Sequence, residues 1–264
     1  MNIELIKPPQ FSKPSLFDIL REVRAPFEFA SVALHFHALR QAPRGNGRAV
    51  LLVPGYLADD HSMRPLGAYL KYLNYDVYYT ELGRNMGKVN TDMMRLGDRV
   101  ESVSQSVGGE KVSLIGWSLG GVYARDLALR MPDMVRYVVT LGSPFAGDIT
   151  ATNAKRVYEM VSGETIQDAD IKDIQALSGD LPVPTSSLYT RTDGIVNWQT
   201  CLVNESDAAE NIEITLASHI GIGVNAAALW AVADRLAQPE GQFHPFDRSG
   251  PFALAYARPE KVRI

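Results

Sequence analysis

The fold of this chain is decided by one stretch of ten residues, Val112-Ser-Leu-Ile-Gly116-Trp117-Ser118-Leu119-Gly120-Gly121. Its first four residues form a short apolar run that is typical of a buried strand. Apolar residues then recur at helical spacing after Gly121 until Pro132 stops the helix. The order of strand, sharp turn and helix predicts that Ser118 stands at the turn.

The flanking glycines explain how such a turn can form. A residue in a tight strand-to-helix turn has a strained backbone, and the chain passes close to itself on either side, so bulky side chains at positions 116 and 120 would block it. Ser118 would stand above the carboxyl end of the strand. The helical amides from Leu119 onward would then point at the charge that develops on a carbonyl oxygen under attack. This geometry suits acyl transfer, and the flanking strand and helix favour it over a glycine-rich bend with a spectator serine.

Composition restricts the class of protein. The chain has 264 residues, 46% of them hydrophobic and 21% charged, which is enough for one sizeable core and predicts a single domain over residues 1–264. Its net charge of −4, with scattered basic residues, makes nucleic acid an unfavourable partner. The one cysteine, Cys201, has no second thiol and no histidine cluster at metal-ligand spacing. We therefore expect a buried small residue there and no metal.

The amino-terminal part of the chain bears on location. Residues 1–9 carry charge and two prolines where a signal peptide needs an apolar core, so we expect a cytoplasmic protein. No stretch approaches the roughly 20 apolar residues that span a bilayer. Residues 25–39 come closest, but Glu28, His35 and His37 interrupt them. That segment either packs on the body as an amphipathic helix, which base rates favour, or touches lipid or a partner.

The rest of the chain alternates between strand and helix patterns. Strands are predicted at 49–54, 75–79, 112–115, 135–141, 186–189 and 212–216, and the helices between and after them include 63–73, 91–107 and 225–236. Apolar strands separated by amphipathic helices indicate an α/β protein with a mostly parallel sheet covered on both faces.

Three segments stand outside this alternation. We expect a helical extension over residues 1–45 and a tail over 238–264 that wraps the surface. Residues 148–185 lie between two predicted strands and have a helical but weakly apolar sequence. They form either a small helical cap above the site or a surface insertion without function, and the sequence does not separate the two.

A serine nucleophile needs a histidine that accepts its proton. The chain has five histidines, and His219 alone follows directly on the last predicted strand. Functional groups gather at the carboxyl ends of parallel strands, so a loop there would bring His219 to Ser118. The others lie before the first core strand, after the loop at 54–55 or in the tail: His35, His37, His61 and His244.

An acid must orient that histidine. Asp193 is the first acidic residue after the strand that precedes the histidine, although Asp-Gly is also a common turn sequence. Order along the chain favours Asp193, because one class of Ser-His-Asp enzymes has the acid between the serine and the histidine. The rivals stand closer to His219, in polar sequence typical of an exposed loop: Glu205, Asp207 and Glu210.

A second amide for the oxyanion is expected in the loop after an early strand. Pro54-Gly55-Tyr56 forms that loop, and Gly55 lets the backbone approach a substrate closely. The amides of Tyr56 and Leu119 would form the oxyanion hole. The alternative is a Pro-Gly turn without a catalytic part.

With these residues in order, the chain resembles the α/β-hydrolases, and within them the lipase-like serine esterases. The resemblance covers most of residues 49–223 and lies in three segments: 53–56, which resembles the lipase oxyanion loop; 116–121, the serine turn; and 140–147, which resembles the strand and turn before the lid. It implies a serine hydrolase that cleaves carboxylic esters through an acyl-enzyme and without a cofactor, with Ser118, His219 and Asp193 as the triad.

The chain departs from the lipase pattern in two ways. Trp117 replaces the histidine that commonly precedes the serine, and no signal peptide is seen, which favours intracellular esters, short acyl chains or thioesters over bulk fat. Trp117 and Trp198 are candidate substrate-binding residues, and a peripheral membrane contact is a further possibility. The alternatives are an acyltransferase or thioesterase that uses the same triad, or a non-catalytic binding protein with this fold.

Overall fold

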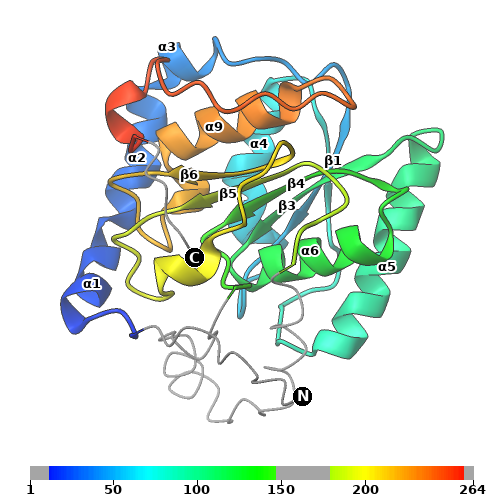
Figure 1. Ribbon diagram of the computed structural model, residues 1–264, viewed down its shortest axis with the longest axis horizontal. Coiled ribbons are helices and arrows are strands. Elements are labelled where there is room, and N and C mark those ends of the chain that lie inside the picture. Colours follow the sequence, from blue (N-terminus) through cyan, green and yellow to red (C-terminus); the bar gives the residue numbers. More distant parts are fainter. Residues whose placement is uncertain (1–11, 147–178, 259–264) are drawn as a thin grey trace, which may run out of the picture.

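The computed structural model describes residues 12–146 and 179–258. Within these residues the core is a six-stranded sheet with the order β2-β1-β3-β4-β5-β6, and every neighbouring pair is parallel. Figure 1 shows this sheet between two layers of helices. The strands are β1 (Ala49–Val53), β2 (Asp76–Tyr79), β3 (Val112–Trp117), β4 (Val135–Leu141), β5 (Thr185–Tyr189) and β6 (Ala209–Glu213).

Helices cover both faces of the sheet, because the central strands are apolar on both sides. In β1, Val50 and Leu52 join the cluster that includes α4 (Arg64–Tyr72) and α9 (Ala226–Ala237). Leu51 and Val53 join the cluster that includes α5 (Val89–Ser106) and α6 (Leu119–Arg130). The predicted mostly parallel α/β sheet with helices on both faces is therefore confirmed.

Short helices precede the sheet and run along one edge of the molecule (Figure 1). Val32 and Ala38 from this region pack against the core, and α2 contacts α9. Glu28 is buried, whereas several apolar side chains on the same helices are exposed. One side of the segment at 25–39 therefore packs against the core of the protein, and another side is exposed to solvent. The short elements are α1 (Leu16–Arg21), η1 (Glu22–Arg24), α2 (Ala25–Leu34), α3 (Phe36–Leu39), η2 (Asp60–Met63), η4 (Trp198–Cys201), η5 (Ile222–Val224) and η6 (Ala253–Ala255).

The last strand is displaced from its predicted position. We predicted a strand at 212–216 from its apolar residues, but β6 spans Ala209–Glu213, and Leu216 is exposed. Glu210, which we expected in an exposed loop, is buried in β6 and lies 2.6 Å from Arg235 of α9. The prediction was wrong because a buried carboxylate with an arginine partner gives no apolar signal.

The remaining expectations fall partly outside the described residues. The predicted cap lies mostly within 147–178, and the start of the helical extension lies within 1–11, so the structure describes neither. In the tail, Phe246, Phe252 and Tyr256 are buried against the core, while residues 259–264 are not described. Cys201 is buried, as the sequence predicted, and burial raises its pKa. No helix among the described residues is both long and apolar enough to cross a bilayer.

Candidate active site

The site is built around the turn between β3 and α6. Ser118 lies between the two elements with φ 53° and ψ −124°, a backbone conformation that residues other than glycine rarely adopt. Its amide donates to the carbonyl oxygen of Leu141 at 2.9 Å, and its own carbonyl accepts from the amide of Gly121 at 3.0 Å. These bonds hold a strained serine at the carboxyl end of a central strand.

Close backbone contacts explain the glycines on either side of Ser118. A Cβ atom at Gly116 would overlap the backbone of Gly120 and Gly121. A Cβ atom at Gly120 would overlap the carbonyl oxygen of Val53 at the end of β1. The turn can therefore form only where side chains are absent at both positions.

Three predicted residues that lie far apart in the sequence are in hydrogen-bond contact. The Nε2 atom of His219 lies 3.1 Å from the Oγ atom of Ser118, and its Nδ1 atom lies 2.7 Å from the Oδ2 atom of Asp193. The Oδ1 atom of Asp193 accepts from the amides of Ile195 at 2.8 Å and Val196 at 2.7 Å. The carboxylate is thus fixed in place, and the imidazole lies between it and the serine.

The electrostatics of His219 follow from its neighbours. Burial by itself lowers the pKa of the imidazole, because the charged form loses its hydration. The negative charge of Asp193, its hydrogen bond and the charge of Glu22 outweigh that effect. The pKa of His219 is therefore raised above the ordinary value of 6.5.

The predicted oxyanion loop lies against the serine. A Cβ atom at Gly55 would stand 3.2 Å from the Cβ atom of Ser118 and 3.2 Å from the carbonyl oxygen of Trp117. The side chain of Asn85 donates to the carbonyl of Pro54 at 3.1 Å and so ties this loop to the segment after β2. The loop that carries the Tyr56 amide and the first residue of α6, Leu119, thus flank the same serine.

The two tryptophans have different surroundings. Trp117 donates from Nε1 to the carbonyl oxygen of His219 at 2.9 Å, and the two rings lie 6.1 Å apart. Trp198 stacks on Tyr189 with centroids 5.7 Å apart and lies under the guanidinium of Arg191. Trp117 therefore holds the backbone that carries the histidine, a contact that the sequence did not predict.

Sequence reasoning also missed Gly142, Glu22 and Glu28. Gly142 follows β4 with φ 55°, and a Cβ atom there would lie 3.2 Å from the Nδ1 atom of His219. Glu22 and Glu28 are buried and accept hydrogen bonds from the loop that carries His219. For Glu28, its place inside an apolar run was a signal of a special partner. The described residues contain no cluster of three or more side chains that could hold a metal ion.

Comparisons with known proteins bear on this geometry. No family model matches the chain. Over 113 residues it is 31% identical to the pimeloyl-[acyl-carrier protein] methyl ester esterase of Shewanella woodyi, a match that covers 43% of this chain and 41% of that protein. The chain thus spans well under half the length of that curated relative.

Solved structures give a broader match. The lipase B structure from Aspergillus fumigatus superimposes with a TM-score of 0.59 at 17% identity, covering 81% of this chain and 58% of that one. The monoacylglycerol lipase of Paleococcus ferrophilus gives 0.51 at 14% identity over 74% of this chain and 96% of that one. This chain therefore has the α/β-hydrolase fold, as its resemblance implied, and its neighbours in that fold include lipases and esterases.

Proposed function

We propose that this protein is a serine hydrolase that cleaves carboxylic esters through an acyl-enzyme. The observation that carries the proposal is the 3.1 Å contact between the Oγ atom of Ser118 and the Nε2 atom of His219. It supports a nucleophile with a base in place, because proton transfer needs heavy atoms at hydrogen-bond distance. The strained backbone of Ser118 supports it further, since strain of this kind persists where function needs it.

In this mechanism Ser118 Oγ attacks the ester carbonyl carbon while His219 Nε2 accepts the hydroxyl proton. Asp193 accepts a hydrogen bond from Nδ1, which keeps the other ring nitrogen free to act as the base and stabilises the imidazolium. The amides of Leu119 and Tyr56 bind the oxyanion. The C–O bond to the alcohol then breaks, and His219 returns the proton to that alcohol.

The second half of the reaction uses the same groups. Water attacks the acyl-enzyme, and His219 accepts its proton. The C–O bond to Ser118 then breaks, the serine regains a proton from His219, and the carboxylic acid leaves. The three side chains and one water molecule account for every bond and proton in these steps, so the proposed reaction needs no cofactor.

The substrate class is proposed at the level of small carboxylic esters or lipids. The name of the curated relative states that it acts on a methyl ester, and its match to this chain supports ester over amide substrates. The cytoplasmic location expected from residues 1–9 and the cap expected at 148–185 stay predictions. Cell fractionation would test the location.

The test is a p-nitrophenyl ester series from acetate to palmitate, run on the wild type and the Ser118→Ala variant. Ser249→Ala, a change at an exposed serine, is the matched control. We expect hydrolysis by the wild type and the control, and a loss of at least about a thousandfold in Ser118→Ala. A labelled fluorophosphonate should react with Ser118 in the wild type and in Ser249→Ala. Equal turnover by all three proteins would overturn the proposal.

The same assay separates water from other acyl acceptors. Adding an alcohol or a thiol tests whether transfer outcompetes hydrolysis, which would assign the chain to acyltransferases. Acyl thioesters in place of the p-nitrophenyl esters test the thioesterase alternative. In each case Ser118→Ala shows whether the activity depends on the same serine.

A further inference from the structure

One buried carboxylate connects the two loops that carry the histidine and the acid. The Oε1 atom of Glu22 accepts from the amide of Gly194 at 2.8 Å and from the amide of His219 at 3.0 Å. Its Oε2 atom accepts from the amide of Ile220 at 2.9 Å. Glu22 is 7% exposed and comes from η1, almost 200 residues before His219 in the sequence.

The hydrogen bonds of Glu22 fix the relative position of Asp193 and His219. Gly194 directly follows the acid, and Ile220 directly follows the histidine, so a single carboxylate binds the backbone beside both. The helix before it lies close as well, because a Cβ atom at Gly194 would overlap the backbone of Asp18. Hydrogen bonds to a charged acceptor are stronger than neutral ones, and two of these three, from the amides of Gly194 and His219, are buried.

The charge of Glu22 also acts on the imidazole. Among the groups around His219, Asp193 and Glu22 are the carboxylates whose charge raises the pKa of the ring. Further charged groups stand beside these loops. Arg24 and Glu28 lie 3.8 Å apart as a pair, and Arg191, in the Asp193 turn, pairs with Glu213 at 3.0 Å. Arg24 donates to the carbonyl oxygens of Thr192 and Ala217, and Glu28 accepts from the amide of Ser218 at 2.8 Å.

We propose that Glu22 is a positioning residue of this active site, whose carboxylate joins the Asp193 turn to the His219 loop. The proposal rests on the Ser-His-Asp mechanism proposed above. Glu22 touches no reacting atom, and its effect is exerted through His219. A second buried carboxylate, Glu28, binds the same loop through the amide of Ser218 but is not among the charges that act on the ring, and so provides a matched control.

The test compares Glu22→Gln with Glu28→Gln, both of which replace a buried carboxylate by an isosteric amide. An NMR titration of the His219 imidazole, assigned with a His219→Gln variant, should show a lower pKa in Glu22→Gln. The acid limb of kcat/KM should move to lower pH in the same variant, and kcat should fall about tenfold because the imidazole is less well placed. In Glu28→Gln the titration of His219 and the acid limb should stay where they are in the wild type.

Several outcomes would overturn the proposal. They are an unchanged titration of His219 in Glu22→Gln, an unchanged kcat, or equal shifts of the titration in both variants. If Glu22→Gln does not fold, Glu22→Asp keeps the charge and shortens the side chain. We then expect a lower kcat with an unmoved acid limb, and a wild-type kcat would contradict the positioning role.

The NMR titration separates this proposal from the proposed function. It needs no turnover, so it reports on Glu22 and His219 even if no ester is hydrolysed. A wild type without Ser118-dependent hydrolysis would refute the serine hydrolase. A Glu22→Gln variant with normal titration and normal turnover would refute the positioning role and leave the hydrolase intact.

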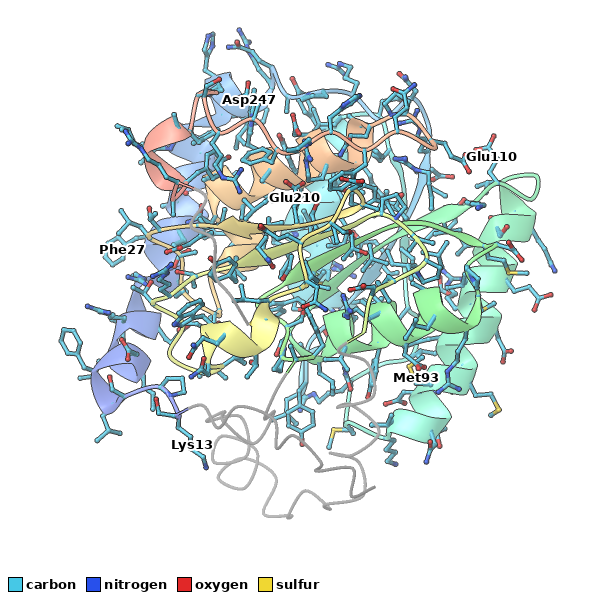
Figure 2. All side chains as sticks on the ribbon, viewed as in Figure 1. Lys13, Phe27, Met93, Glu110, Glu210 and Asp247 are labelled. Carbon is cyan, nitrogen blue, oxygen red and sulfur yellow. The ribbon has the colours of Figure 1, made fainter. Side chains whose placement is uncertain are left out.

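A different observation concerns the outer side of the amino-terminal helices. Within residues 16–36 eight large apolar side chains are exposed, and Phe27, which is 75% exposed, lies at the outer edge of the molecule in Figure 2. Scattered exposed apolar residues are ordinary, but a group of this density on short helices is unusual. We call this group the apolar face: Leu16, Phe17, Leu20, Val23, Phe27, Phe29, Leu34 and Phe36.

A hydrogen bond connects the segment that carries the apolar face to the site. Ile220, next to His219, is exposed, and its amide is bound by Glu22, which directly precedes Val23 of the face. The loop before it also exposes Leu216. An apolar molecule that binds at the face would therefore lie near the loop that carries the histidine.

The charges around the face are mostly positive, in contrast to the net charge of −4 of the chain. Residues 12–48 contain six lysines and arginines but three acidic residues. Two of these acids, Glu22 and Glu28, are turned inward, and the third, Asp18, pairs with Arg21 at 3.0 Å. Exposed cations remain at the two ends of the segment, at Lys13, Arg40 and Arg44.

We infer that this face docks on an anionic lipid surface. Apolar side chains with cations around them match the two attractions such a surface offers, insertion at the acyl boundary and attraction to negative headgroups. A second copy that docks through the same face would bring these positive charges together, whereas anionic headgroups complement them. The docking does not depend on ester hydrolysis, so it is tested by binding alone.

The test is co-flotation of the whole protein with phosphatidylcholine vesicles, with and without phosphatidylglycerol. We expect binding that increases with the anionic lipid and decreases with salt. The double variant Leu20→Ser/Phe27→Ser should bind about tenfold more weakly, because each side chain loses its transfer free energy. The control Met94→Ser on α5 removes an exposed apolar side chain elsewhere and should bind like the wild type.

Three results would overturn this inference. They are absence of vesicle binding by the wild type, equal binding by the wild type and the double variant, and a concentration-dependent dimer that the double variant abolishes. Light scattering coupled to size exclusion would detect the dimer. That last result would assign the face to a second copy of the chain.

Discussion

The Nδ1 atom of His219 and the Oδ2 atom of Asp193 lie 2.7 Å apart and are almost fully shielded from solvent, with 6% and 2% of their side chains exposed. The carboxylate has two further hydrogen bonds, from the amides of Ile195 and Val196. Its position is thus set by its own turn, and the imidazole aligns to it. Replacing the acid should therefore affect the histidine before it affects the fold.

Asp193→Asn should lower kcat by about ten-thousandfold. The amide oxygen can still accept from Ile195 and Val196, but the amide nitrogen would face Nδ1 and stabilise the tautomer that cannot act as a base toward Ser118. Stopped-flow or single-turnover kinetics with a p-nitrophenyl ester measure the decrease in the catalytic rate. Circular dichroism should show a wild-type fold, and a fully active Asp193→Asn would mean that another acid orients His219.

The raised pKa of His219 predicts a pH dependence of activity. The neutral imidazole is the form that accepts the proton of Ser118, so kcat/KM should fall as the pH drops through the raised pKa, above the ordinary 6.5. The pH profile of kcat/KM measures this limb. An acid limb of kcat/KM with its midpoint below pH 6.5 would show that burial lowers the pKa of His219 by more than the two carboxylates raise it.

The same shift predicts a pH dependence of stability with the opposite direction. Because the folded pKa of His219 is raised, its protonated form stabilises the folded state fully below 6.5, and this contribution is lost as the pH rises through the folded pKa. Denaturant unfolding below pH 6.5 and above the folded pKa should show a free energy of unfolding that decreases as the pH rises. The decrease should be smaller in His219→Gln, which has no titrating ring at that position.

Gly142→Ala should lower kcat by more than its effect on the free energy of unfolding explains. Its φ of 55° makes any side chain costly, by about 1 kcal/mol, and a Cβ atom would press on Nδ1 of His219 at 3.2 Å. Gly109→Ala is the matched control, because Gly109 also has a positive φ of 85° but has nothing within 4 Å. Both variants should lose similar free energy of unfolding, whereas kcat should fall, roughly tenfold, in Gly142→Ala alone. Equal kcat values would show that the imidazole tolerates the methyl group.

The sequence predicts the parts of this site that depend on local patterns, and it misses those that depend on contacts between residues far apart in the chain. The turn at Ser118 is visible because strand, glycine and helix patterns are local, and the parallel sheet then indicates where His219 and Asp193 would have to lie. Glu22 carries no such pattern, because its partners are backbone amides almost 200 residues away. The side-chain role of Trp117 was invisible for the same reason.

The displaced strand has a related cause. Residues 212–216 look like a strand because Ile212, Ile214 and Leu216 alternate with polar residues, but β6 begins earlier, at Ala209, and pairs from there with β5. Its buried Glu210 binds Ser186 of β5 and Arg235 of α9, contacts that exist only in the folded chain. Local hydrophobicity thus predicts the existence of the strand, and tertiary partners set its position.

The two candidate roles of Trp117 can be separated by kinetics. If Trp117 holds the histidine loop through its 2.9 Å hydrogen bond to the carbonyl of His219, Trp117→Phe should lower kcat about tenfold and leave KM unchanged. If Trp117 binds substrate, as the sequence suggested, KM should rise instead. Trp198→Phe tests the second candidate substrate-binding residue in the same assay, and Trp198 packs on Tyr189 and Arg191. A change in KM with either variant would support the substrate-binding role for that residue.

Glu210 provides the sharpest test of what holds the last strand in place. Its Oε1 atom lies 2.6 Å from the Nη1 atom of Arg235, and its Oε2 atom accepts from the amide of Phe246 at 2.8 Å. Glu210→Ala leaves the buried guanidinium of Arg235 with Asp234 as its remaining carboxylate, so the free energy of unfolding should fall by about 3 kcal/mol, the low end for a broken buried pair.

Glu213→Ala on the same strand is the matched control for Glu210. Glu213 pairs with Arg191 at 3.0 Å, and because Arg191 is partly exposed the loss should be about 1 kcal/mol or less. Urea unfolding of both variants measures the difference. In the double variant Glu210→Met/Arg235→Met the loss should be smaller than in Glu210→Ala, since no buried guanidinium remains and Asp234, which loses its pairing with Arg235, is 26% exposed. Equal losses in Glu210→Ala and Glu213→Ala would mean that β6 is held by its backbone pairing with β5, and that the buried charge contributes little.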